Sequence, residues 1–136
     1  MDALRKIHRS LTTTGVLLDL HPEPRDSRAE VAREGRLEIV GGWDQEEDLR
    51  DIRLARAQLD LAESEGFFVT DRQVSFDMLE HYPSVEDWLD HRTERGETVA
   101  IGEEIVDKAR NLLANGGELI IREAIRASLL LRLPRD

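Results

Sequence analysis

The sequence predicts an α/β domain made of a mixed sheet, one hairpin and flanking helices. Segments with helical and strand periodicity follow one another in the order helix, strand, hairpin, helix, strand, two helices, strand, which indicates a layered structure. The 136 residues fit a single domain, and a hydrophobic content of 40% is sufficient for its core. Because the chain contains no cysteine, no disulfide contributes to its stability.

The first half of the chain contains two helical segments with strands between them. Residues 1–11 carry apolar side chains and a histidine at helical spacing, which predicts a short helix. The continuous apolar run Val16–Leu20 predicts a strand that is covered on both faces. Residues 28–42 form two strand-like runs around Glu34-Gly35, which predicts a hairpin. Residues 44–64 place leucine, isoleucine and alanine on a wide stripe, which predicts a helix packed on the core.

The second half begins with a strand and ends with a longer one. Aromatic and β-branched residues predict a strand over Phe67–Phe76. A short helix is expected after Pro83 and a second one over residues 102–114. Residues 119–133 alternate between apolar and polar side chains, which predicts a long half-covered strand or a strand with a bulge; fully extended, it would reach roughly 50 Å. That length exceeds the need of a small sheet, so we expect part of this strand to pack on something outside its own core.

The charge of the chain argues against nucleic-acid and membrane partners. Asp and Glu number 29 against 19 Lys and Arg, which gives a formal net charge of −10. This charge repels phosphate backbones and anionic lipids. No apolar run reaches the roughly 18 residues of a membrane span, and the N-terminal segment lacks the apolar core of a secretion signal. We therefore expect a cytoplasmic protein.

Sequence motifs predict neither a catalytic residue nor a metal ligand. The chain contains no glycine-rich nucleotide-binding motif, no His-Glu-x-x-His and no cysteine-based metal spacing. His81 and His91 are separated by a proline-initiated helix and do not share a helical turn, so we expect ordinary solvated or capping side chains there.

One segment resembles a known family. The run Ala3–Leu20, ALRKIHRSLTTTGVLLDL, resembles the region of class I S-adenosylmethionine-dependent methyltransferases where a helix ends in a Leu-x-Pro-Gly-Gly turn and enters the fifth strand. Thr13 and Thr14 stand where the family usually has Pro and Gly, and Gly15 is kept. Gly66-Phe67-Phe68 and the final strand are similar to the sixth and seventh strands. The resemblance implies the C-terminal part of a Rossmann-like fold over the whole of residues 1–136.

The resemblance also implies what the chain lacks. In the family, the glycine-rich loop and the acidic residue that hold the cofactor lie upstream of the matched portion. We therefore expect no cofactor in the isolated chain, and S-adenosylmethionine only if a partner supplies the missing half. The fourth strand, which would pair with Val16–Leu20, is missing as well. Since an open strand edge promotes association, we expect a homodimer or a protein that supplies the missing strands.

Three functions are consistent with these expectations. The first is a non-catalytic, methyltransferase-like half-domain that self-associates, with interface candidates Val16, Leu18, Leu20, Leu129 and Leu131. The second is the substrate-side subunit of a split methyltransferase. There the carboxyl ends of parallel strands would form a ligand-binding rim, which His21, His81 and Tyr82 would face. The third is a small-ligand binding module that uses the same rim.

Overall fold

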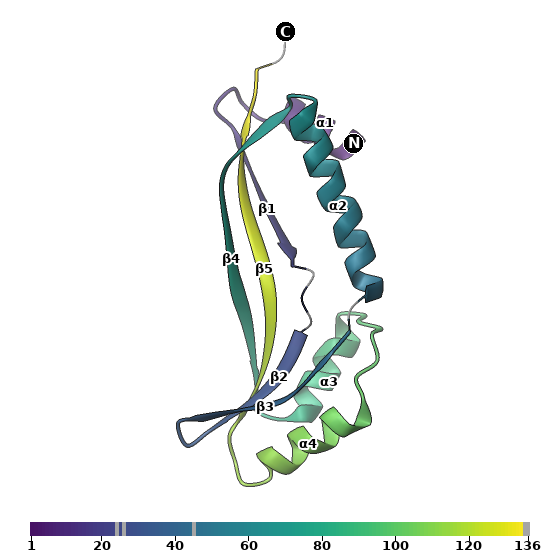
Figure 1. Ribbon diagram of the computed structural model, residues 1–136, viewed down its shortest axis with the longest axis vertical. Helices are drawn as coiled ribbons and strands as arrows, with labels where there is room; N and C mark the ends of the chain where they lie inside the picture. Colours follow the sequence, from purple (N-terminus) through teal and green to yellow (C-terminus); the bar gives the residue numbers. More distant parts are fainter. Residues whose placement is uncertain (24, 26, 45, 135–136) are drawn as a thin grey trace. The chain divides into compact units, whose positions relative to one another are not determined.

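The structure of the chain is a computed structural model that describes residues 1–23, 25, 27–44 and 46–134, without the side chains of 46–48. Its helices and strands follow one another in the predicted order (Figure 1). They are α1 (Asp2–Ser10), β1 (Val16–Pro22), β2 (Ser27–Arg33), β3 (Arg36–Trp43), α2 (Glu46–Ser64), β4 (Phe68–Tyr82), α3 (Val85–Glu94), α4 (Glu103–Leu113) and β5 (Glu118–Arg132). None of the described helices is both long and apolar enough to span a bilayer.

The predicted hairpin is confirmed, and its turn explains why it forms. β2 and β3 pair in antiparallel fashion around Glu34 and Gly35, which both have positive φ angles of 50° and 73°. Two successive residues of this kind make the turn whose twist matches that of the flanking strands. Strand β4 is longer than predicted, because it continues beyond Phe76 to Tyr82.

The expectation of a mixed sheet with parallel strands is wrong. β5 lies between β1 and β4 along part of its length and pairs with β2 along another part (Figure 1). The pairs β1 with β5, β2 with β5 and β2 with β3 all run antiparallel. The spacing and composition of apolar residues identify a strand, but they do not determine the direction in which it pairs. Here the connections place each of these strands antiparallel to its partner.

The chain divides into two compact units, each with its own core. Unit 1 comprises Met1–Glu23, Glu46–Phe76 and the chain from Ile125 on. Its sheet is made of β1 and the adjoining parts of β4 and β5, and α1 and α2 lie on one face of it. Phe67, Phe68, Ala62 and Leu130 form the buried centre of this core. His8 is also buried there, and its Nε2 lies 2.8 Å from the carbonyl oxygen of Leu133.

Unit 2 comprises the described residues between 24 and 45 together with Asp77–Ala124. It contains the β2–β3 hairpin, helices α3 and α4, and the remaining parts of β4 and β5. Its core is built around Trp43 and Trp88, whose ring centroids lie 5.5 Å apart. Ile105 and Ala109 of α4 and Leu119 of β5 complete the packing on these rings.

Candidate functional site

One face of the unit 1 sheet is apolar and uncovered. In register, Val16, Leu18 and Leu20 of β1 lie opposite Leu131, Leu129 and Ala127 of β5. Val74 of β4 lines a shallow apolar hollow together with Leu18, Ala127 and Leu129, and Phe76 follows Val74 on the same side of the strand. We call this set the bare face; its members are Val16, Leu18, Leu20, Val74, Phe76, Ala127, Leu129 and Leu131.

The opposite face of the same strands is well covered. Leu17, which precedes Leu18, packs with Phe68 and Leu130 against side chains of α1 and α2. Leu130 is 1% exposed, whereas its neighbour Leu131 is 37% exposed. Since successive residues of a strand point to opposite faces, this contrast separates a helix-covered side from the bare face. The expectation that Val16–Leu20 is covered on both faces is therefore wrong for the described chain.

The bare face is large for a soluble monomer. Its six large members with the greatest exposure, Val16, Leu18, Leu20, Val74, Phe76 and Leu131, are between 37% and 59% exposed. Together they leave on the order of 500 Å² of apolar surface in contact with water, at the upper end of the range for monomers. Arg72 is the one charged side chain that lines the hollow beside Leu18.

Strand β1 also forms an edge of the described sheet. It ends the strand order, and β5 is the strand that pairs with it among the described residues. Its outer edge therefore presents backbone N–H and C=O groups that no described strand satisfies. Edges of this kind accept an additional strand from another chain.

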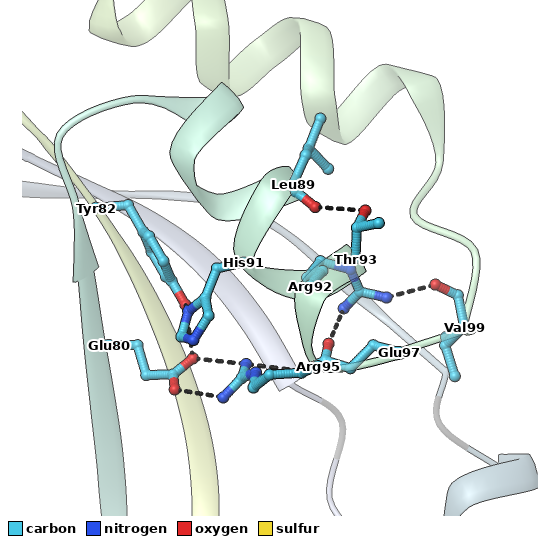
Figure 2. A network of polar contacts seen from close by, with 9 residues as sticks. All are labelled: Glu80, Tyr82, Leu89, His91, Arg92, Thr93, Arg95, Glu97 and Val99. Carbon is cyan, nitrogen blue, oxygen red and sulfur yellow. Dashed lines mark hydrogen bonds and ion pairs between the residues drawn. The ribbon is translucent and has the colours of Figure 1, made fainter.

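A cluster of charged and hydrogen-bonding side chains lies where α3 meets β4 in unit 2. Figure 2 shows Glu80 and Tyr82 of β4 facing His91 and Arg95. Two nitrogens of Arg95 donate to the two carboxylate oxygens of Glu80 at 2.7 and 3.1 Å. The Tyr82 hydroxyl donates to Glu80 at 3.0 Å and lies 2.7 Å from His91 Nδ1. Beside this pair, Arg92 binds the carboxylate of Glu97 at 2.7 Å.

Burial and hydrogen bonds shift the pKa values of three side chains of the cluster. Burial raises the pKa of Tyr82 to about 12, and the hydrogen bond to Glu80 adds to the effect. Burial would raise the pKa of Glu80, but hydrogen bonds from Arg95 and Tyr82 outweigh it and lower the pKa. Burial, with Glu80 and Glu97 nearby, raises the pKa of Glu123. At neutral pH Tyr82 is thus an un-ionised hydroxyl that lies between the carboxylate of Glu80 and the ring of His91, and these contacts connect α3 to β4.

The three rim candidates do not share one environment. His21 belongs to unit 1, where its Nδ1 lies 2.6 Å from Asp19 Oδ2 and its backbone lies opposite Arg126. His81 and Tyr82 belong to unit 2 and, as neighbours in a strand, point to opposite faces; His81 pairs with Glu118 at 2.9 Å. The predicted rim required parallel strands whose carboxyl ends gather, and the antiparallel pairing removes that basis.

The interface candidates, by contrast, all lie on the bare face. Val16, Leu18, Leu20, Leu129 and Leu131 come from two strands and share one side of the sheet. The sequence interpretation did not include Val74 and Phe76, because alternation along the strand gives them the parity of Phe68, which lies on the covered side. The described residues contain no group of three or more His, Cys, Asp or Glu that could hold a metal ion.

Comparisons with protein-family models, curated proteins and solved structures gave no match to this chain. A function must therefore be argued from the bare face, the open edge of β1 and the polar clusters themselves.

Proposed function

We propose that the protein is a non-catalytic module that self-associates through the bare face of unit 1. The observation that carries this proposal is the contrast between the two faces of β1, one packed on helices and the other apolar and exposed. Four of the five residues Val16–Leu20 are apolar, and the exception, Asp19, shares the side of Leu17, so the bare-face positions of the run are all apolar. A second copy of the chain would supply the missing cover.

The size of the bare face suits a two-fold dimer. An interface of ordinary size buries roughly 800 Å² on each partner, of which about 55 to 65% is apolar. The roughly 500 Å² of exposed apolar surface on the bare face matches that requirement. Closed two-fold pairing of identical faces is the commonest form of self-association and leaves no apolar surface for further copies.

The test compares two leucines of equal exposure in unit 1. Leu18 lies on the bare face and is 59% exposed; Leu54 lies on α2 and is 60% exposed. Burial of a leucine contributes about 1.5 to 3 kcal/mol when complete, and a two-fold dimer contains Leu18 twice. Because 59% of each Leu18 remains to be buried, the loss is at least about 1.8 kcal/mol, and at 1.4 kcal/mol per tenfold change Leu18→Arg should weaken dimerisation at least about 20-fold. Leu54→Arg makes the same chemical change and should have no effect.

Sedimentation velocity across a concentration series measures the dimer dissociation constant of each variant. A wild-type chain that stays monomeric at millimolar concentration would reject the proposal. Equal weakening by Leu18→Arg and Leu54→Arg would show that the added charge, not the bare face, is responsible.

The open edge of β1 favours a second candidate function. A class I methyltransferase half that carries the cofactor site could add a strand at this edge, which would make the chain the substrate-side subunit of a split enzyme. The pairing of β1 with the final strand on its other side is the arrangement that the family resemblance implies. Calorimetric titration with S-adenosylmethionine should then show no binding heat for the chain alone and a binding heat once such a cofactor-binding half-domain is added. Absence of binding heat in both cases would reject this candidate.

A further inference from the structure

A polar hollow in unit 2 is lined mainly by arginines. It has a volume of about 160 Å³ and is bounded by Arg25, Arg28, Asp77, Arg122 and Ala124. That is more than ten times the roughly 10 to 15 Å³ that a cavity needs to admit one water molecule, so a phosphate group can enter it. Three guanidinium groups around one hollow stand out in a chain whose net charge is −10.

Two of these arginines are held by a fully buried carboxylate. Glu30 of β2 is 0% exposed and accepts hydrogen bonds from Arg28 Nε at 2.7 Å and from Arg122 Nε and Nη2 at 3.1 and 3.0 Å. Asp77 accepts a further hydrogen bond from Arg122 Nη1 at 3.0 Å. The guanidinium of Arg122 is therefore fixed on three of its nitrogens, while that of Arg28 is fixed at Nε alone.

This arrangement is not explained by stability. Arg28 and Arg122 lie directly opposite each other on paired strands, where like charges are destabilising. Burying a carboxylate to hold them offers little net gain, since buried ion pairs rarely exceed the stability of apolar side chains of similar volume. The register of β2 with β3 shifts by one residue between Ala29 and Glu30, where Val40 of β3 has no partner, and irregularities of this kind redirect side chains near functional sites.

The hydrogen-bonding groups left over in the hollow suit an anion of a particular kind. Arg28 Nη1 and Nη2 form a planar pair of donors that no described residue occupies, and its side chain is 45% exposed. Paired donors of this geometry suit phosphate oxygens. Ala124 lines the hollow with a single methyl group and leaves space. Asp77 keeps one oxygen to accept a hydrogen bond from a ligand hydroxyl, and its negative charge disfavours polyphosphates.

We propose that this hollow binds the phosphate group of a small, hydroxyl-bearing phosphate monoester. Arg28 and Arg122 contact the phosphate oxygens, and Asp77 contacts a hydroxyl of the same molecule. The proposal is independent of self-association, because the hollow lies in unit 2 and the bare face in unit 1.

The test is calorimetric titration of the full chain with glycerol 3-phosphate, inorganic phosphate and acetate at constant low ionic strength. We expect saturable binding of the monoester, weaker binding of inorganic phosphate and none of acetate. Arg28→Gln should weaken monoester binding at least tenfold. Arg110→Gln removes the same charge from an exposed arginine on α4 of unit 2 and should leave the affinity unchanged.

Ala124→Val provides a test that alters no charge. The larger side chain fills the hollow and should weaken monoester binding at least as much as Arg28→Gln. Leu18→Arg, which acts on the bare face, should not change it. Absence of saturable binding, or equal weakening by Arg28→Gln and Arg110→Gln, would overturn the proposal, and acetate binding as tight as the monoester would reject phosphate as its ligand class.

Discussion

Replacement of Glu30 by glutamine tests the buried charge cluster of unit 2. Glu30→Gln keeps the shape of the side chain but removes the charge that Arg28 and Arg122 share. Removal of one partner from a fully buried ion pair costs about 3 to 5 kcal/mol. Because the side chains of Arg28 and Arg122 are 45% and 23% exposed, water partly solvates them once Glu30 is neutral. We therefore expect the free energy of unfolding at pH 7 to fall by about 2 to 3 kcal/mol.

The pH dependence of this loss follows from the pKa of Glu30. Burial would raise that pKa, but hydrogen bonds from Arg122 and Arg28 outweigh burial and lower it below the ordinary 4.5. The stabilisation is therefore complete above pH 4.5 and disappears as the pH falls through the lowered value of the folded state. The glutamine variant lacks this contribution at every pH. The difference in free energy of unfolding between the wild-type protein and the variant should therefore disappear at acidic pH.

Urea unfolding followed by circular dichroism measures both effects. With a slope of about 1 to 3 kcal/mol per molar urea, the midpoint at pH 7 should fall by roughly 0.7 to 3 M. Glu86→Gln removes an exposed carboxylate that pairs with Arg110 and should leave the midpoint unchanged. A loss of unfolding free energy below about 0.5 kcal/mol at pH 7 would refute the reasoning, and so would a difference between the two proteins that persists at acidic pH.

Three further predictions concern single side chains. Leu130→Ala should lower the free energy of unfolding by about 2 to 5 kcal/mol, because Leu130 is buried. Leu131→Ala should lower it by less than about 1 kcal/mol in the dissociated chain. Chemical denaturation at low protein concentration measures both. Ser84→Ala removes the N-cap of α3, where Oγ accepts from the Asp87 N–H at 3.1 Å, and should cost about 1 kcal/mol, read as a lower melting temperature. Tyr82, the single tyrosine, should ionise at about pH 12 in the folded chain and near pH 10 in urea, so folded stability should fall as the pH rises between these values; an ultraviolet titration with a folded-state midpoint near pH 10 would contradict the buried contacts.

The order of helices and strands was predictable because each depends on local periodicity. The turn at Glu34 and Gly35 and the stop near Gly66 are encoded by residues next to the elements they end. The direction of pairing was not predictable in this way, since β1 and β5 are far apart in the sequence and either direction preserves the alternation of Leu129 and Leu131. The family resemblance implied parallel strands, and the observed pairings are antiparallel.

The two candidate sites differ in how much of each could be predicted from the sequence. The interface candidates of β1 and β5 were named because an apolar run without its sheet neighbour and an overlong final strand can be recognised in the sequence; that they form an interface stays a prediction. The cluster around Glu30 was missed, because an isolated glutamate in an alternating strand normally points to solvent. Arg28, Asp77 and Arg122 meet it only through strand register, which no short segment of the chain encodes.

The contact between the rings of Trp43 and Trp88 has a practical consequence. They are the two tryptophans of the chain, and both lie in the core of unit 2. Intrinsic fluorescence excited at tryptophan wavelengths therefore reports on that core and is blind to the packing of Phe67, Phe68 and Leu130 in the other unit. An unfolding transition that appears in tryptophan emission but not in circular dichroism, or the reverse, would distinguish the unfolding of one core from that of the other.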